Sequence, residues 1–279
     1  MNTALPSPDK GAADQTAGCA NIGRWLNTHC GIHFTESKMD LLAHRMVHVV
    51  RQFNLTSLAE LALLLEEGKR PDIQLAAVHA ASTNYTYFFR EPQVLRVFQN
   101  DALPTYANRS SIRIWSAAAS TGDEAYTLAI IACEVFGRSN APGRVSVLGT
   151  DISAPVIERA EAGIYAASHL AETAPDIVKR YFKPWGIGQF RIAEDVRQMC
   201  TFRRMNLDTH PFPFQQQFQV VFCRNVLYYF DREHQTRTLA ALYGATEPGG
   251  WLMTSVTEIV RDLGAPWSVI GSGVCRRSP

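Results

Sequence analysis

The sequence predicts an α/β protein, in which an all-helical N-terminal domain precedes an open parallel sheet with a small antiparallel β-subdomain. Two patterns support this fold class. From Ile22 to about Ala80, apolar residues recur at three- and four-residue spacings, which is typical of amphipathic helices. Beyond Arg90, short β-prone segments alternate with helical stretches, and this alternation indicates a parallel sheet covered by helices on both faces.

The composition is that of a globular chain and excludes several classes of protein. Among 279 residues, 27 Lys and Arg nearly balance 26 Asp and Glu, so no long-range field attracts nucleic acid or a membrane surface. Apolar stretches fall short of the roughly 20 residues that cross a bilayer, and the N-terminus lacks a signal-peptide core. Six scattered cysteines without a C-x-x-C pair indicate a reducing compartment. We therefore expect a cytoplasmic monomer with no metal, no nucleic-acid partner and no membrane insertion.

The N-terminal region divides into a tail and a helical domain. Residues 1–18 are rich in Ala, Gly, Pro, Asp and Ser and lack periodicity, which predicts a flexible tail outside the fold. Residues 19–82 form the predicted helical domain. Thr56 or Ser57 is a plausible N-cap for its third helix, because Glu60 then falls in the first turn.

The parallel sheet is expected within a second domain, residues 93–279. Its predicted strands are Ile112–Trp115, Val145–Leu148, Phe218–Phe222, Trp251–Ser255 and a final strand Val269–Cys275, and its helices include 123–137, 154–163 and 231–244. Two further β-prone pieces, Gln189–Ile192 and Met199–Arg203, flank a polar turn. They predict an antiparallel β-subdomain over about 187–204.

Two features at the ends of the first two strands suggest a nucleoside ligand. A loop of small residues, 117–122, follows the first strand, where a parallel sheet opens its ligand crevice, but it lacks the G-x-G-x-x-G that cradles a diphosphate. Asp151 ends the second strand, where a carboxylate can accept hydrogen bonds from ribose hydroxyls. Together they favour S-adenosylmethionine over a dinucleotide. Alternatively, the small residues allow tight packing, and Asp151 or Ser153 caps the next helix.

Two polar segments elsewhere have both a functional and a structural interpretation. Arg224-Asn225 interrupts an apolar run at the carboxyl end of a predicted strand, so these side chains should face the crevice. The alternative is an arginine paired with a nearby carboxylate, beside an aromatic core cluster at 228–230. Residues 83–92 concentrate aromatic, amide and arginine side chains at the domain boundary and predict a linker that lines a cleft. The alternative is an interdomain clamp in which Phe88 and Phe89 are core residues and Arg90 pairs with Glu91.

Together these segments resemble one family closely, the chemoreceptor glutamate O-methyltransferases of the CheR type. The resemblance spans roughly residues 20–275, and its motifs occur in the order of the family. They are Thr-Asn-x-Thr-x-Phe-Phe-Arg-Glu at 83–91, Arg-Ile-Trp-Ser-Ala-Ala-x-Ser-Thr-Gly-x-Glu at 113–124, Thr-Asp-Ile-Ser at 150–153, Ala-x-x-Gly-x-Tyr at 160–165, Asn-Leu at 206–207, Phe-Cys-Arg-Asn-Val-Leu-x-Tyr-Phe-Asp at 222–231 and Pro-Gly-Gly at 248–250.

The resemblance implies a Rossmann-like S-adenosylmethionine domain that methylates glutamates on the cytoplasmic part of chemoreceptors and releases S-adenosylhomocysteine. The positions that match cofactor-binding residues are Asn84, Thr86, Arg90, Glu124, Asp151, Asn206, Leu207, Arg224 and Asn225. Tyr229 and Arg90 match the residues considered for handling the reacting carboxylate. We prefer Arg90 as an organiser of the cofactor end, because a tight pair with the substrate carboxylate would lower its nucleophilicity.

Several departures from the family pattern bear on function. The usual Gly-Glu-Glu-Pro-Tyr reads Gly-Asp-Glu-Ala-Tyr at 122–126, which is a mild change. Gly-His-Ser-Glu reads Ser-Val-Thr-Glu at 255–258, and this change in a loop near the crevice places turnover in question more than cofactor binding. The helix expected at 38–54 offers only Arg45, His48 and Arg51 for receptor docking. The turn 183–189 is short, which predicts a member independent of a receptor C-terminal pentapeptide. The alternatives are a methyltransferase with another substrate, or a non-catalytic cofactor-binding relative that acts as an interaction module.

Overall fold

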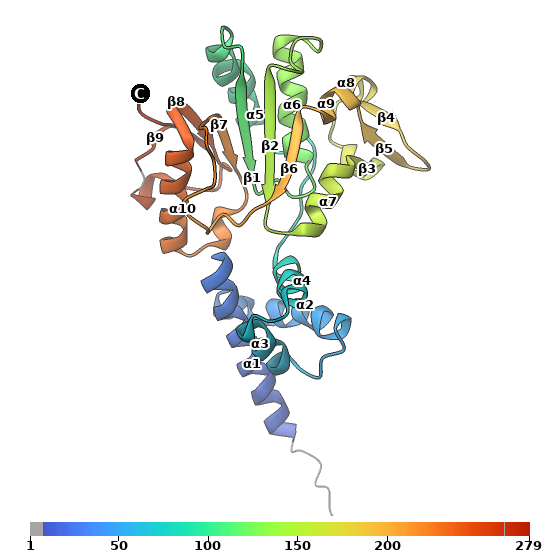
Figure 1. Ribbon diagram of the computed structural model, residues 1–279, viewed down its shortest axis with the longest axis vertical. Helices are drawn as coiled ribbons and strands as arrows, with labels where there is room; N and C mark the ends of the chain where they lie inside the picture. Colours follow the sequence, from blue (N-terminus) through green and yellow to red (C-terminus); the bar gives the residue numbers. More distant parts are fainter. Residues whose placement is uncertain (1–7, 265) are drawn as a thin grey trace, which may run out of the picture. The chain divides into compact units, whose positions relative to one another are not determined.

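The computed structural model describes residues 8–264 and 266–279, whose course is traced in Figure 1. The chain divides into two compact units. One contains the residues up to Thr83 together with Tyr229–Asp231, and the other contains Asn84–Tyr228 and Arg232–Pro279. Within the described residues, no helix combines the length and the apolar character needed to cross a membrane.

The first unit is a set of four helices around an apolar core. They are α1 Pro8–Cys30, α2 Met39–Gln52, α3 Leu58–Glu67 and α4 Pro71–Ala81, with a short 3-10 turn at Glu36–Lys38. Ile22, Leu26, Leu42, Met46 and Leu61 are fully buried in it. The periodicity of the sequence predicts this unit correctly, because each helix buries one apolar stripe.

The expected flexible tail is wrong for residues 8–18, which form the first part of α1, while residues 1–7 lie outside the described chain. Gly18 shows why this segment folds. A Cβ on Gly18 would come within 2.5 Å of the Ala59 backbone nitrogen, so α1 approaches α3 closely at this point. Gln15 also connects α1 to α3, because its side-chain oxygen accepts a hydrogen bond from the backbone N–H of Leu58 at 3.3 Å.

The start of α3 is capped as one of the two expected residues predicts. Ser57 is the N-cap, and its hydroxyl accepts the Glu60 N–H at 3.1 Å. The Glu60 carboxylate in turn accepts the backbone N–H of Thr56 at 2.6 Å. Reciprocal bonds of this kind satisfy N–H groups that the first turn of a helix leaves unpaired.

Residues Tyr229–Asp231 belong to the helical unit although they follow Arg224-Asn225 in the sequence. Phe230 forms an antiparallel bridge with Ile32, and the His33 N–H donates to the Tyr229 carbonyl at 2.7 Å. The Asn27 side-chain amide donates to the Asp231 carboxylate at 2.9 Å. This short segment is therefore fixed by the chain around the end of α1.

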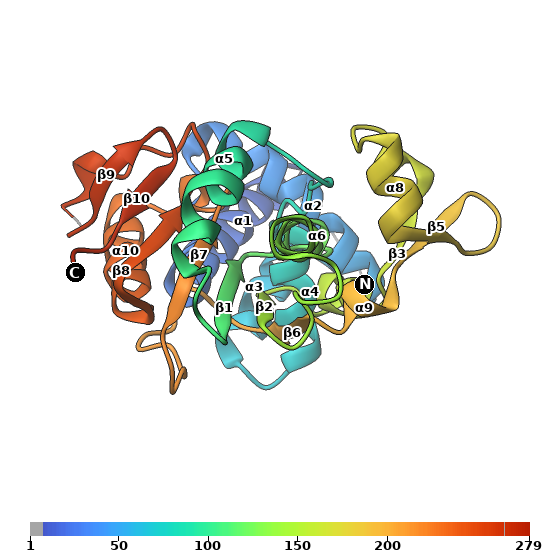
Figure 2. The same ribbon diagram turned by 90° about the horizontal axis from the view of Figure 1, so that it is seen from above.

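The second unit contains the predicted parallel sheet. Its strands are β1 Ile112–Ala117, β2 Val145–Asp151, β6 Cys200–Arg204, β7 Phe218–Cys223, β8 Thr246–Met253, β9 Ser268–Gly271 and β10 Val274–Arg276. Their order is β6-β2-β1-β7-β8-β10-β9, in which the first five run parallel, β10 is antiparallel to β8, and β9 is antiparallel to β10. The principal helices are α5 Pro92–Val97, α6 Asp123–Phe136, α7 Ala154–Ala162 and α10 Arg232–Ala245 (Figure 2).

A separate three-stranded antiparallel sheet forms the β-subdomain, but its composition differs from the expectation. Its order is β3 Ile164–Ala166, β5 Gln189–Ile192 and β4 Phe182–Pro184, next to the helices α8 Pro175–Tyr181 and α9 Glu194–Arg197. The prediction that Met199–Arg203 belongs to the β-subdomain is wrong. This segment forms β6, which pairs parallel with β2. Alternation in a short strand shows which face is buried, but it does not reveal the partner strand.

The predicted final strand Val269–Cys275 is also two strands. β9 and β10 form a hairpin around Ser272-Gly273, and Gly273 adopts a φ of 69°. A Cβ at this glycine would lie 2.6 Å from the Thr254 carbonyl oxygen, so the turn fits closely against the chain after β8. One β-prone run is thus folded back on itself by a single left-handed residue.

Candidate functional site

The candidate site lies within the second unit, at the edge where its parallel strands end. β1, β2, β6, β7 and β8 run in the same direction, so their carboxyl ends share one edge of the sheet. The chain leaves β1 for β2 on one side and later returns to β7 on the other, which makes this a topological switch point. Ligands of open α/β sheets bind at such a point.

The loop between β1 and α6 is held in an unusual backbone conformation. Ala118 and Ser120 have φ values of 65° and 49°, in the left-handed region that costs a non-glycine residue about 1 kcal/mol or more. Gly122 has a φ of 89°, and a Cβ there would lie 2.9 Å from that of Ala160. The Ser120 hydroxyl donates to the Asn84 carbonyl at 3.0 Å. The surrounding contacts therefore maintain a strained loop next to the switch point.

Asp151 connects this loop to the end of β2. Its carboxylate accepts the Ser120 N–H at 2.9 Å and the Ser153 N–H at 3.0 Å, one on each oxygen. The residue is 7% exposed, and this burial raises the pKa of Asp151, although the backbone N–H groups of Ser153, Ser120 and Ile152 oppose the rise. Ser153 starts α7 without a side-chain cap bond. Asp151 thus stabilises the loop and retains room to accept ligand hydroxyls.

Asn206 and Leu207 follow β6 beside Asp151. The Met205 N–H donates to the Asp151 carbonyl at 2.8 Å, which ties the turn after β6 to the end of β2. The Asn206 side-chain oxygen accepts the Asp208 N–H at 3.0 Å, and Leu207 is buried. The structure therefore brings these two predicted residues to the same edge as Asp151.

Arg224, at the end of β7, lies in a network of carboxylates. Its side chain is 2% exposed, and its Nη1 donates to Glu124 at 3.0 Å while its Nη2 donates to the Arg90 carbonyl at 2.6 Å. A second ion pair joins its Nη2 to Glu91 at 3.4 Å. Among the described residues, its buried Nε has no hydrogen-bond partner. The arginine is thus paired, as the alternative interpretation expects, and still carries one unsatisfied donor at the candidate site.

The two carboxylates around Arg224 differ in their electrostatics. Burial raises the pKa of Glu124, against the opposing effects of Arg224 and of the Ser116 hydroxyl, which donates to it at 2.8 Å. Burial alone would also raise the pKa of Glu91. Hydrogen bonds from Asn225, Ser255 and the Val256 N–H, together with the charge of Arg224, outweigh it and lower the pKa of Glu91. Glu91 is therefore the more firmly ionised partner of Arg224.

The segment 84–91 contributes the Glu91 carboxylate, backbone carbonyl groups and the Arg90 side chain. The Arg90 Nη1 donates to the Tyr85 carbonyl at 2.9 Å, and the guanidinium lies 5.8 Å and 6.0 Å from the ring centres of Tyr85 and Tyr87. Its separation from Glu91 is 4.0 Å, so that pair is weak, while Glu91 bonds Asn225 and Ser255 instead. Thr86 is half-buried in the same segment. The pairing of Arg90 with Glu91 in the alternative interpretation is therefore not the main contact of either residue, although Phe88 is fully buried as that interpretation predicts.

Glu258 is a residue that the sequence did not single out for a role at this site. Its carboxylate accepts four backbone N–H groups at 2.8–3.1 Å, from Asn225, Val226, Leu227 and Ser255. It is 8% exposed, and burial raises the pKa of Glu258, opposed by those four bonds. Asn225 has a φ of 57°, so Glu258 fixes a left-handed turn at a predicted cofactor residue. The signal available in the sequence was the glutamate kept at the end of Ser-Val-Thr-Glu.

Tyr229, the predicted substrate-aligning residue, belongs to the other unit. Its carbonyl accepts the His33 N–H, and the residue is half-buried at the end of the 3-10 turn Leu227–Tyr229. Its role in the reaction stays a prediction.

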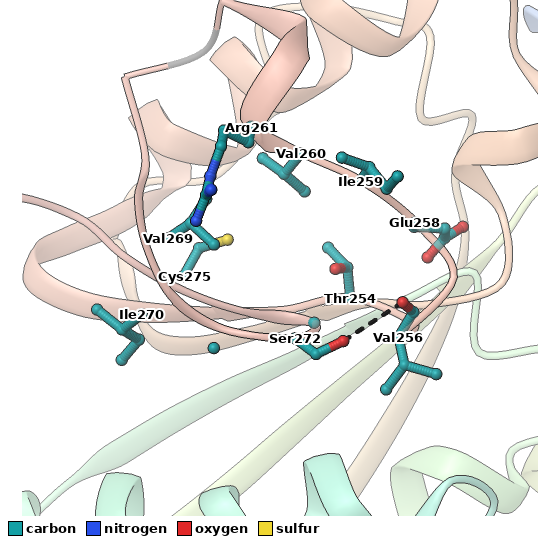
Figure 3. A pocket seen from close by; sticks show the side chains of 12 residues that line it. Thr254, Val256, Glu258, Ile259, Val260, Arg261, Val269, Ile270, Ser272 and Cys275 are labelled. Carbon is teal, nitrogen blue, oxygen red and sulfur yellow. Dashed lines mark hydrogen bonds between the residues drawn. The ribbon is translucent and has the colours of Figure 1, made fainter.

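A pocket of about 550 Å³ lies between the chain after β8 and the β9–β10 hairpin (Figure 3). Ile259, Val260 and Val269 give it apolar walls, and Arg261 and Glu258 are its charged lining residues. The predicted cofactor residues do not line it. We place the candidate site at the edge of the sheet, because the predicted cofactor residues meet there and not in this pocket.

The residues at the edge fit S-adenosylmethionine. Asp151 has acceptor capacity for ribose hydroxyls, and the β1–α6 loop presents backbone in place of a diphosphate cradle. The Arg224 Nε is a buried donor without a hydrogen-bond partner among the described residues, so it can donate to a ligand. An open parallel sheet with these features defines the class of S-adenosylmethionine-dependent methyltransferases.

The chain belongs to the CheR methyltransferase family. Residues 84–272 match the CheR methyltransferase SAM binding domain, and residues 19–79 match the CheR methyltransferase all-alpha domain. A chemotaxis protein methyltransferase of Vibrio parahaemolyticus is 34% identical, over 87% of this chain and 89% of its own length. Chemotaxis protein methyltransferase 2 of Pseudomonas aeruginosa is 33% identical, over 92% and 93%, and the Escherichia coli relative is 31% identical, over 91% and 88%. The predicted family, fold and cofactor are confirmed.

Proposed function

We propose that this protein methylates glutamate side chains on the cytoplasmic part of chemoreceptors and produces glutamate methyl esters and S-adenosylhomocysteine. The supporting observation is the Asp151 and Arg224 constellation at the edge of a CheR-family sheet, together with relatives named chemotaxis protein methyltransferases. The activity would take place in the cytoplasm, and we expect the protein to act as a monomer.

Methylation of a glutamate carboxylate requires no proton transfer by the protein. A free glutamate has a pKa of about 4.3, so its carboxylate is already a nucleophile at neutral pH and needs no general base. When bound, S-adenosylmethionine supplies a methyl group on a sulfonium sulfur, which a carboxylate oxygen accepts as the thioether departs. The protein therefore contributes positioning and exclusion of water.

Individual residues are proposed for these tasks. Asp151 accepts the ribose hydroxyls, and Arg90 organises the cofactor end of the site. The other residues proposed to hold the cofactor are Asn84, Thr86, Glu124, Asn206, Leu207, Arg224 and Asn225. The Tyr229 hydroxyl aligns the substrate carboxylate without changing its protonation state.

A base-release assay tests this function. Glutamate methyl esters release volatile methanol in base, whereas methylated amines and nucleic acids do not. We expect methanol after incubation with labelled S-adenosylmethionine and a cytoplasmic receptor fragment. Transfer of label that is stable to base would indicate another substrate. Cofactor binding without any transfer would indicate an interaction module. It would also indicate that the Ser-Val-Thr-Glu departure at 255–258 accompanies a loss of turnover.

We further propose that methylation does not require a receptor C-terminal pentapeptide. Only Trp185-Gly186-Ile187-Gly188 connects β4 to β5, and the Trp185 N–H donates to the Gln189 carbonyl at 2.8 Å, so the connection closes tightly. A short closed connection offers little backbone for an added strand. Titration with a receptor C-terminal pentapeptide should show no saturable binding, and micromolar binding would contradict this proposal.

A further inference from the structure

Asp123 is a fully buried carboxylate directly beside the β1–α6 loop, residues 117–122, which we call the cofactor loop. It is the first residue of α6 and follows Gly122, and its side chain is 0% exposed. The Thr121 hydroxyl donates to one of its oxygens at 2.6 Å, and the Nδ1 of His169 lies 2.9 Å from the other. Burying a carboxylate costs several kcal/mol unless it is paired, so these contacts decide whether the start of α6 is stable.

His169 approaches Asp123 from the β-subdomain. It lies in the 3-10 segment Ala167–Leu170, which follows β3 directly. Tyr165 of β3 contacts the same loop, because its hydroxyl donates to the Thr121 carbonyl at 2.8 Å. The β3 segment thus holds residues 121–123 at two points, once through a neutral hydroxyl and once through a histidine that can carry charge.

We propose that His169 is a positioning residue for the cofactor loop: its ion pair with Asp123 fixes Thr121 and Gly122 in the binding conformation, so the affinity for the cofactor depends on the charge of His169. The inference rests on the placement of the cofactor at this edge. It does not depend on which substrate is methylated. Of the two side chains in the pair, that of Asp123 is 0% exposed and that of His169 is 37% exposed.

The surroundings of His169 set the direction of the pH dependence. The hydrogen bond that the His169 ring donates to Asp123 raises the pKa of His169, while burial and the charge of Arg159 on α7 act against it. The Tyr165 ring, 5.8 Å away, stays neutral because burial raises the pKa of its hydroxyl well above the usual value. The ion pair is therefore complete at pH values below the raised pKa of His169 and is lost as the pH rises through it. Affinity for the cofactor should fall over the same interval.

Calorimetry with S-adenosylhomocysteine between pH 6 and 8.5 tests this proposal. We expect the parent protein to lose affinity about fivefold as the pH rises, which is within the usual range of coupling between two sites. His169→Gln should bind weakly and with no comparable change across this range. His44→Gln, at an exposed histidine on α2, should keep the parental profile and serves as the matched control. Any titration of the ligand itself is common to all three proteins and cancels in the comparison.

A second measurement uses the parent protein and does not depend on whether the variant folds. Because linkage is reciprocal, bound S-adenosylhomocysteine must raise the pKa of His169, which NMR of selectively labelled histidine follows. An unchanged pKa on binding would overturn the proposal, as would a parental pH profile in folded His169→Gln. If S-adenosylhomocysteine fails to bind at every pH, the cofactor assignment fails and this inference fails with it. If it binds normally but no receptor is methylated, only the proposed substrate is wrong.

Discussion

Asp151 and Glu258 are buried carboxylates that stabilise loops at the same edge of the sheet, and they differ in how fully their acceptor positions are used. Asp151 accepts the N–H groups of Ser120 and Ser153, with a weaker contribution from that of Ile152. Glu258 accepts four backbone N–H groups. A carboxylate has about four acceptor positions. Glu258 is therefore saturated by its own chain, whereas Asp151 keeps capacity for a ligand.

The comparison suggests how to separate binding residues from scaffold residues among buried acids. Both are almost equally buried, and burial raises the pKa of each, so neither exposure nor charge distinguishes them. The number of internal donors does. We expect substitution of Glu258 to affect stability first and substitution of Asp151 to affect cofactor affinity first. The following predictions test that division.

The largest effect is expected for Glu258→Gln. Glutamine keeps one acceptor oxygen and turns an NH₂ group towards N–H donors, so about two backbone N–H groups would lose their partners at ~1–3 kcal/mol each. The free energy of unfolding, measured by urea titration, should fall by about 3 kcal/mol. Glu233→Gln is the control, because this α10 side chain is 78% exposed and should change stability by less than about 0.5 kcal/mol. An equal loss in both variants would show that Glu258 does not hold the turn after β7.

Tyr229→Phe extends the comparison to the residues that follow this turn. Loss of an orienting hydrogen bond to a charged group costs about 1.5–3 kcal/mol, or roughly ten- to a hundredfold in rate. Single-turnover methyl transfer should slow by that factor, while calorimetric affinity for S-adenosylhomocysteine stays at the parental value. Tyr228→Phe, at the exposed neighbouring position, should leave both unchanged. Parental transfer would make Tyr229 a packing residue, and a parallel fall in affinity would move it into the cofactor pocket.

Asp151→Ala tests the carboxylate that is expected to affect cofactor affinity more than stability. The ribose hydroxyls would lose their acceptor, at a cost of about 1–3 kcal/mol, so affinity for S-adenosylhomocysteine should fall roughly five- to 150-fold. Calorimetry gives the affinity, and urea titration of the same variant shows whether stability changes less than in Glu258→Gln. An affinity within about twofold of the parent would remove Asp151 from the site.

The smallest expected effect is a loss of affinity for the cofactor at acidic pH. Because burial raises the pKa of Asp151, its carboxyl takes up a proton at a higher pH than an exposed aspartate, whose pKa is about 3.9. Protonation removes an acceptor, so affinity should decline several-fold as the pH falls from 7 towards about 4.5. Glu91, whose pKa is lowered, remains ionised against Arg224 over most of this range. Constant affinity with the fold intact by circular dichroism would contradict this prediction.

The sequence alone determined the fold class, the family and the strand ends that carry the site. Helical spacing defined the first unit. The β1–α6 loop and Arg224-Asn225 each stand directly after an apolar strand, and Asp151 is the last residue of β2. These features are local, because a strand and the loop that follows it are specified by neighbouring residues. The parallel direction of the strands then places all of the loops at one edge without further information.

Tertiary structure alone decided which distant segments meet. Met199–Arg203 could have formed a hairpin with its neighbour, yet it pairs with β2, about fifty residues earlier. Glu258 reaches Asn225, and His169 reaches Asp123 across 46 positions. A carboxylate's partners depend on which backbone N–H groups its burial leaves within reach, and that is set by the packing of whole elements. Residue types therefore predicted a binding role for Asp151, but only the packed fold showed that its acceptor positions are less fully used than those of Glu258.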